Sequence, residues 1–275
     1  MPDEATIPGS VPMVKSPVLA MPKPRFQPPI ITFMAVPGFG KTTTAAFAPK
    51  PAIVMAGDEL GYLTLLGAGR VPTVPCVTIT TWEQFIAFLD ELIIQDKIDF
   101  KTLVLDAIGG FERMCHQFVC DRDFGGDWGE GGFKSFQQGY DVAMNDWRLM
   151  LNRIERVRAR GIMILMLSHT HVRTVKNLTG HDYPGLTGDS HRKSWAQIQR
   201  VSDAVLLGKF YAVVEKIQGQ HKGLGGKDRV VYTEGCDVFD AKNRYGMKQL
   251  IDLSEDPKEN WSIIWDQIKP QSRET

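Results

Sequence analysis

The feature that most constrains the fold is a glycine-containing turn between an apolar run and a helical pattern. Residues 30–34 read IITFM, residues 35–42 read AVPGFGKT, and a helical pattern covers 43–47. This order is typical of a Walker A loop, G-x-x-x-x-G-K-[ST], in which backbone N–H groups and a helix N-terminus surround phosphate. The segment therefore predicts a strand, a phosphate-binding turn and a helix.

Each position of the turn has a predicted role. Gly38 and Gly40 let the backbone N–H groups point inward, Lys41 places its charge on the β- and γ-phosphates, and Thr42 offers a hydroxyl to Mg²⁺. Ala35 stands where the consensus has its first glycine, which keeps most of the space but affects the loop geometry. The predicted cofactors are ATP and Mg²⁺. The predicted nucleotide-binding residues are Pro37, Gly38, Phe39, Gly40, Lys41, Thr42 and Thr43.

Short apolar runs alternate with helical patterns after residue 30. The runs are 30–34, 52–55, 103–105, 162–167 and 204–207. Consecutive apolar residues are typical of strands covered on both faces, so we expect an α/β fold with a mainly parallel sheet and helices on both faces. Glycine turns follow Lys209, among the segments 213–217, 223–226 and 230–233, and predict C-terminal antiparallel hairpins.

Two helices are predicted between these strands. Thr81 and Gln84 have the spacing of a capping box before an apolar pattern. Apolar residues recur at steps of three and four over 141–160, and Gly161 ends that pattern. Both helices are expected to pack on the sheet.

Composition limits the remaining classes. Lys plus Arg and Asp plus Glu number 32 each, so any nucleic-acid contact must come from a local patch. No apolar run is long enough to span a bilayer, and no secretory signal is recognisable, which predicts a cytoplasmic protein without membrane contact. Residues 1–29 hold eight of the sixteen prolines and predict a disordered tail, leaving 30–268 as one ATPase domain.

The four cysteines are too scattered for a disulfide framework. Cys115, His116 and Cys120 lie close together, but a structural zinc site needs four ligands. We therefore expect these residues to lie on a helix and to pack against the neighbouring elements, with a zinc site as the alternative.

Acidic and polar residues follow three of the predicted strands. Asp106 ends the run 102–106 and is the candidate Mg²⁺ ligand, while Glu59 is the candidate that polarises the attacking water. Asp58 could exchange roles with Glu59, or both could be helix-start acids. His169 ends another strand and is either a sensor of the γ-phosphate or a structural residue.

Residues 242–246 read KNRYG and are similar to the KNRFG signature of RadA-type proteins. With the motifs above, the chain resembles the RecA/RadA/DnaB superfamily, and in particular the phage-encoded RecA-like ATPases described as phage nucleotide-binding or Sak-group single-strand annealing proteins. Further points of similarity are Trp128-Gly129, Phe133-Lys134, Pro184-Gly185-Leu186 and Asp203.

The resemblance implies a RecA-like P-loop core and a homo-oligomer, a ring or filament, with ATP between subunits. It implies that Lys242 and Arg244 reach the γ-phosphate of a neighbouring subunit; the alternative is a basic pair on a solvated hairpin. It further implies single-stranded DNA as a partner, with a single-strand-binding protein as a possible second one.

In such proteins the DNA-contacting loop follows the fourth strand. Here the corresponding stretch is 171–195, which offers Tyr183 and Trp195 as stacking faces. Its candidate DNA-binding residues are Arg173, Lys176, Arg192 and Lys193.

Together these features predict an ATP-hydrolysing protein that acts on single-stranded DNA in phage recombination or annealing. Two alternatives stay open. One is an assembly switch that binds nucleotide without significant turnover, and the other is a P-loop kinase acting on a small molecule.

Overall fold

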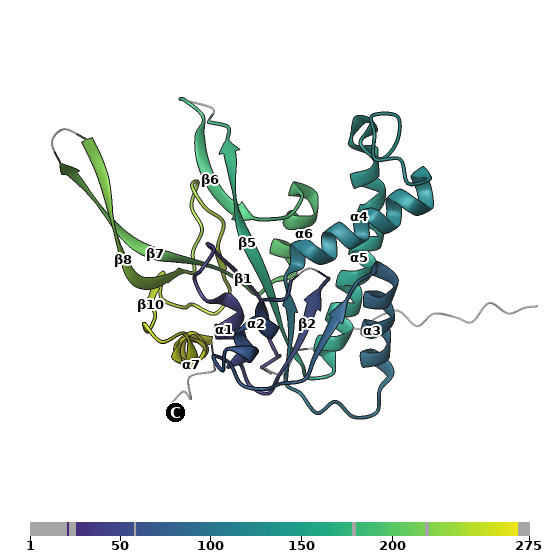
Figure 1. Cartoon of the computed structure of the whole chain (residues 1–275), viewed down its shortest axis with the longest axis horizontal. Coiled ribbons are helices and arrows are strands. Elements are labelled where there is room, and N and C mark those ends of the chain that lie inside the picture. The colour runs from purple at the N-terminus through teal and green to yellow at the C-terminus, as the bar shows by residue number, and fades with distance from the viewer. Residues whose placement is uncertain (1–20, 22–25, 58, 178–179, 218–219, 269–275) are drawn as a thin grey trace, which may run out of the picture.

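The computed structural model describes residue 21 and the ranges 26–57, 59–177, 180–217 and 220–268 (Figure 1). Asp58 and most of the predicted tail therefore lie outside the described residues. Within the described ranges, no helix is long and apolar enough to cross a membrane.

Six parallel strands form the centre of the sheet. Their order is β7-β1-β5-β4-β2-β3. The bounds are β1 Ile30–Ala35, β2 Pro51–Ala56, β3 Cys76–Ile79, β4 Thr102–Asp106, β5 Met163–Val175 and β7 Ala204–Ile217. All six residues of β1 are buried, as expected for a strand covered on both faces. This confirms the mainly parallel α/β class, with β3 added to the predicted set.

Helices cover both faces of this sheet, and each face has its own apolar core. On one face lie α3 (Trp82–Ile94), α4 (Ile108–Phe124), α5 (Gln138–Ala159) and α6 (Arg192–Val201). On the other lie α1 (Lys41–Ala46), α2 (Gly61–Gly67) and α7 (Pro257–Ile268). Side chains alternate along β1, so Met34 belongs to the first core and Phe33 to the second. Burying each such side chain contributes about 1.5–3 kcal/mol.

Both predicted helices are confirmed. Thr81 caps α3 by accepting the backbone N–H of Gln84 at 3.3 Å. The long helix α5 begins at Gln138, slightly earlier than predicted, and Gly161 follows it with a φ of +87°. Its predicted apolar stripe is buried: Ala143, Trp147, Met150, Ile154 and Val157. Cys115 and Cys120 are buried in the same core, on α4.

The sheet extends into antiparallel strands after its central part. β8 (Gln220–Tyr232) pairs with β7, β10 (Leu250–Asp252) pairs with β8, and β9 (Lys242–Asn243) pairs with the start of β7. The prediction of C-terminal antiparallel hairpins is confirmed. The prediction of a glycine turn at 223–226 is wrong, because these residues lie within β8, and 223–225 pair with Ala212–Val214 of β7.

The predicted loop 171–195 is likewise wrong. β5 continues to Val175, β6 (Tyr183–Gly188) returns antiparallel to it, and α6 begins at Arg192. Residues 171–174 are exposed, so this part of the strand lacks the apolar run by which a buried strand is recognised. In Figure 1 the β5–β6 and β7–β8 hairpins both project from the sheet.

Candidate active site

The glycine-containing turn lies between the last residue of β1 and the first residue of α1. Gly38 has a φ of +76° and Gly40 a φ of +102°, in the left-handed region that residues with a Cβ rarely adopt. A Cβ at Gly38 would meet nothing within 4 Å, so space lies open above the turn. The N-terminus of α1 faces that space, which favours an anion there.

Phe39 anchors the turn to the core and to β8. Its ring is fully buried and meets the ring of Phe33 edge-on, with 5.8 Å between the centroids. Its carbonyl oxygen accepts a hydrogen bond of 2.8 Å from Nε of Arg229, a residue of β8. The same guanidinium lies over the ring of Phe210. The turn is thus held by an apolar anchor and a charged donor.

Lys41 and Thr42, the first two residues of α1, contact different partners. Lys41 Nζ donates to the carbonyl oxygen of Ala35 at 3.0 Å and lies 3.5 Å from Nδ1 of His169. Burial lowers the pKa of Lys41, while the charges of Asp106 and Glu59 oppose that shift. The hydroxyl of Thr42 donates to Oδ2 of Asp106 at 2.8 Å.

Asp106 ends β4 at the carboxyl edge of the sheet, where its side chain is buried. Burial raises the pKa of Asp106 to about 6, although the hydrogen bond from Thr42 opposes the rise. A carboxylate in this environment is stabilised by a nearby cation. Hydroxyl and carboxylate oxygens are also ligands that Mg²⁺ prefers, so Thr42 and Asp106 fit the predicted metal.

His169 lies between Glu59 and Lys41 and contacts both. It does not end its strand as predicted, because β5 continues to Val175, but it pairs in register with Ala35, the last residue of β1, which brings it next to the turn. Its Nε2 lies 3.5 Å from Oε1 of Glu59, on the side opposite its contact with Lys41. Glu59 itself comes from the segment between β2 and α2. Five predicted residues therefore converge here: Lys41, Thr42, Glu59, Asp106 and His169.

Sequence reasoning missed the glycines that let other elements approach the site. A Cβ at Gly110 would lie 2.4 Å from Cβ of Ala56, and one at Gly109 would lie 2.6 Å from the carbonyl oxygen of Asp189. The pair therefore permits α4 to begin close to β2 and to the 188–191 turn. The adjacent glycines three and four residues after Asp106 are the sequence signal that could have indicated this close approach. Arg229 was also missed, and nothing local in the sequence indicates its role.

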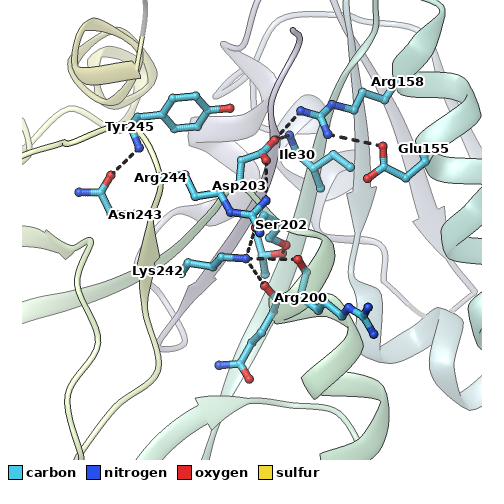
Figure 2. A network of polar contacts seen from close by, with 12 residues as sticks. Ile30, Glu155, Arg158, Arg200, Ser202, Asp203, Lys242, Asn243, Arg244 and Tyr245 are labelled. Atoms are coloured by element: carbon cyan, nitrogen blue, oxygen red, sulfur yellow. Dashed lines mark hydrogen bonds and ion pairs between the residues drawn. The ribbon is translucent and has the colours of Figure 1, made fainter. Parts of the chain in front are cut away.

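Lys242 and Arg244 lie near the amino ends of the parallel strands, whereas the site lies near the carboxyl ends of β1 and β4. β9 pairs with Ala204 and Val205, at the amino end of β7. Lys242 Nζ donates to three carbonyl oxygens at the end of α6, at 2.7 Å for Gln199, 3.2 Å for Arg200 and 2.6 Å for Ser202. Figure 2 shows Lys242 beside Arg200 and Ser202. Within this chain, Lys242 therefore caps a helix C-terminus.

Arg244 belongs to the same network through Asp203. The carboxylate of Asp203 is nearly buried and accepts from Arg158 Nη2 at 2.8 Å, from Arg244 Nη1 at 3.2 Å and from the backbone N–H of Ile30 at 3.0 Å (Figure 2). About half of the Arg244 side chain stays exposed, at 54%. Arg244 is thus anchored on one side and accessible on the other.

The four candidate DNA-binding residues do not form a loop. Arg173 lies on β5 and pairs with Asp240 at 3.0 Å, and Lys176 pairs with Asp182 at 2.6 Å. Arg192 and Lys193 form the first turn of α6, where Lys193 pairs with Asp141 and Arg192 is exposed.

One of the two predicted stacking faces is absent from the surface. Trp195 is buried, with 2% of its surface exposed, and its Nε1 donates to Asp240 at 2.8 Å. The prediction of Trp195 as a stacking face is therefore wrong, because α6 turns the ring into the core. Tyr183, at the start of β6, is partly exposed.

The chain was compared with family models, curated proteins and solved structures. The model of the AAA domain family matches residues 27–245. Among solved structures, the chain is similar to the RadB recombinase at 12% identity and a TM-score of 0.46, covering 84% of this chain and 90% of that one. It is also similar to the flagellar accessory protein FlaH from Methanocaldococcus jannaschii at 8% identity and a TM-score of 0.39, covering 82% and 85%. No curated protein matches the sequence.

Proposed function

The chain belongs to the AAA domain family, and from this premise we propose that it is an Mg²⁺-dependent ATPase that acts on single-stranded DNA in recombination or annealing. The observation that carries the proposal is that five side chains lie close together beside the turn. A cation, a hydroxyl, two acids and an imidazole meet within hydrogen-bond or ion-pair distance. The cation, the hydroxyl and the two acids are groups that P-loop proteins use to bind Mg²⁺ and phosphate and to orient the attacking water.

Each residue has a distinct task in this proposal. The amides of 38–41 and the ammonium of Lys41 bind the phosphates and orient the γ-phosphate toward Glu59. Thr42 and Asp106 would hold Mg²⁺, which when bound neutralises the phosphate charge. Glu59 polarises the attacking water, and His169, between Glu59 and Lys41, reports whether the γ-phosphate is present.

We also propose that the active unit is a homo-oligomer, with Arg244 completing the site of a neighbouring subunit. Its position supports this idea, because the exposed side of Arg244 lies at the edge of the sheet away from its own turn. For Lys242 the same role would require its three carbonyl contacts to break.

The DNA part of the proposal draws its support from β5. His169 and Arg173 lie on one strand with even spacing, so their side chains share a face. A change at His169 can thus pass along the strand to the β5–β6 hairpin. The KNRYG signature further supports placement among phage-encoded annealing ATPases. In this proposal Arg192 binds DNA phosphates directly. Arg173, Lys176 and Lys193 bind them after exchanging their acidic partners for phosphate oxygens.

The experiment is ATP turnover measured with and without single-stranded DNA, together with particle size by light scattering. Turnover that rises with DNA in an assembled species supports the proposal. ATP-dependent assembly without turnover would instead establish the assembly switch. Phosphate transferred to an added metabolite rather than to water would establish the kinase.

A further inference from the structure

Two arginines from different elements share the carboxylate of Asp203 (Figure 2). Arg158, in the last turn of α5, donates from Nη2 to Oδ2 at 2.8 Å. Arg244, which follows β9, donates from Nη1 to Oδ1 at 3.2 Å. The side chains of Arg158 and Asp203 are 15% and 10% exposed, whereas that of Arg244 is 54% exposed. The acid is therefore paired with one buried and one solvent-facing cation.

The backbone of Arg244 is held independently of its side chain. Its N–H donates to the carbonyl oxygen of Asp203 at 3.1 Å. The preceding residue, Asn243, belongs to β9, and its Oδ1 accepts the N–H groups of Tyr245 at 3.0 Å and Met247 at 3.1 Å. The guanidinium of Arg244 can therefore leave Asp203 by rotation about its side-chain bonds while its Cα stays in place.

Arg158 lowers the free-energy cost of that rotation. A buried carboxylate that loses its last cation is strongly disfavoured, because its charge is left unpaired where the dielectric constant is low. When Arg244 turns away, Asp203 keeps its hydrogen bond from Arg158. It also keeps the hydrogen bond of 3.0 Å from the backbone N–H of Ile30. In addition, two guanidinium groups beside one carboxylate repel each other, which weakens the hold on the exposed one.

Arg158 is itself fixed by other partners. Its Nε donates to the carbonyl oxygen of Pro28 at 2.7 Å, and its Nη1 lies 3.5 Å from Oε2 of Glu155. These contacts keep Arg158 at Asp203 whether or not Arg244 is there. The contact of Arg244 with Asp203 is longer and open to solvent, and ion pairs of that kind contribute little stability.

We propose that Arg158 is a positioning residue for the arginine that acts on the neighbouring subunit, an inference that rests on the proposed function. Asp203 holds Arg244 against its own subunit before assembly. Arg158 keeps this hold weak enough for the γ-phosphate of a neighbouring ATP to replace Asp203 as the partner of Arg244. The exchange is favoured because the γ-phosphate carries more negative charge than a carboxylate that is already paired.

The central variant is Arg158→Gln, which leaves Asp203 with Arg244 as its guanidinium partner. Turnover at saturating ATP should fall about ten-fold or more, because the departure of Arg244 then leaves a buried carboxylate without a cation. The KM for ATP should stay within about two-fold, since the phosphate-binding turn is unchanged. Arg156→Gln, which alters an exposed arginine of the same helix, is the matched control and should change neither value.

A second substitution separates this role from a purely structural one. In the double variant Arg158→Gln with Asp203→Asn, the acceptor is neutral and no longer retains Arg244. Turnover should therefore rise at least about five-fold above that of Arg158→Gln, although more contacts have been removed. A double variant as slow as Arg158→Gln, or slower, would show that Arg158 only supports the fold. Urea denaturation of each variant measures stability separately.

Subunit mixing locates the defect. Arg158→Gln is mixed with an excess of Lys41→Ala, whose Arg158 and Arg244 are intact. Turnover per Arg158→Gln subunit should rise, because its sites are then completed by a neighbour whose Arg244 is released normally. Recovery in the mixture of Arg244→Ala with Lys41→Ala shows that subunits exchange.

With exchange shown, no rise for Arg158→Gln would place the defect in its own site and overturn this inference. Normal turnover by Arg244→Ala would instead reject the role of Arg244 in a neighbouring site, and this inference with it. The ATPase assignment fails separately, if the unmodified chain does not hydrolyse ATP.

Discussion

Ala35 of β1 faces Gly208 of β7 across a parallel strand pair, and a Cβ on Gly208 would lie 2.9 Å from that of Ala35. The same Cβ would come within 2.6 Å of the Phe39 ring. The chain lacks the first glycine of the loop consensus, yet it has a glycine opposite that position. The space that a glycine at position 35 would leave is thus supplied from the neighbouring strand.

Gly208→Ala should therefore damage the phosphate-binding turn. The added methyl group pushes against Phe39 and Ala35, and overpacking of this kind costs about 1–3 kcal/mol of unfolding free energy. We expect a lower midpoint in urea denaturation and weaker ATP binding by calorimetry. Adding Ala35→Gly should recover part of the stability. Gly67→Ala, whose Cβ would meet nothing within 4 Å, serves as the control and should not lower stability.

Lys41→Ala should abolish ATP binding. Lys41 supplies the ammonium group among the five converging residues, next to the imidazole of His169. Removing this ammonium group leaves the phosphates without the cation that binds them directly. Equilibrium dialysis with ATP measures the effect, and Lys101→Ala, at an exposed position, should bind normally. Intact ATP affinity in Lys41→Ala would refute the phosphate assignment.

Glu112 and His116 predict opposing effects of pH on stability. They lie one turn apart on α4, with 3.9 Å between His116 Nε2 and Glu112 Oε1. Burial raises the pKa of Glu112 from 4.5 to about 7 and lowers that of His116 from 6.5 to about 4. Stability linked to Glu112 is therefore lost as pH rises from about 4.5 to 7, whereas stability linked to His116 is lost as pH falls from about 6.5 to 4.

Glu112→Gln removes the first effect and keeps an acceptor for the backbone N–H of His191. Relative to the unmodified chain, its unfolding free energy should rise by on the order of 2 kcal/mol between about pH 5 and pH 7.5. Urea denaturation at several pH values measures this difference. A difference independent of pH would contradict the assignment of Glu112 as a buried, raised-pKa carboxyl.

Arg244→Ala should bind ATP normally but turn it over about 10³-fold or more slowly, because an arginine that neutralises the transferred phosphoryl group affects only the reaction. The role in trans has its own test. Mixing Arg244→Ala with Lys41→Ala subunits should restore part of the turnover, since some interfaces then combine an intact turn with an intact arginine. Arg200→Ala is the exposed-arginine control. Normal turnover by Arg244→Ala with DNA present would end this interpretation.

Lys242→Ala should act mainly on stability. Three carbonyl oxygens at the end of α6 lose their charged donor, which costs about 1–3 kcal/mol. Thermal unfolding measures the loss, with Lys248→Ala as an exposed control. If Lys242→Ala unfolds like the unmodified chain and loses only turnover, its main role is at a neighbouring active site.

The sequence predicted those parts of the fold that local chemistry determines. The strands 30–35 and 102–106 are mostly apolar and fully buried, and the turn between β1 and α1 needs glycines at 38 and 40. Because parallel strands run in register, Asp106 and His169 could be placed near the same turn from the sequence, although His169 lies within β5 and not at its end.

The remainder depends on tertiary contacts that no local pattern encodes. Residues 171–175 extend β5 beyond the core, where neither face is buried and no apolar period marks the strand. The role of Arg229 depends on a partner 190 residues away. The pairing of Asp203 with Arg158 and Arg244 likewise depends on three separate segments.

The two hydrogen bonds that Arg229 donates, to the carbonyl oxygens of Phe39 and Glu255, have a practical consequence for shortened versions of this protein. A shortened version that stops before residue 254 would keep every signature residue of the Walker motif and Arg229, yet it would lose Glu255, which holds that arginine from the other side, and all of α7. Poor nucleotide affinity in such a truncation would report a missing support, and should not be counted against the ATPase assignment.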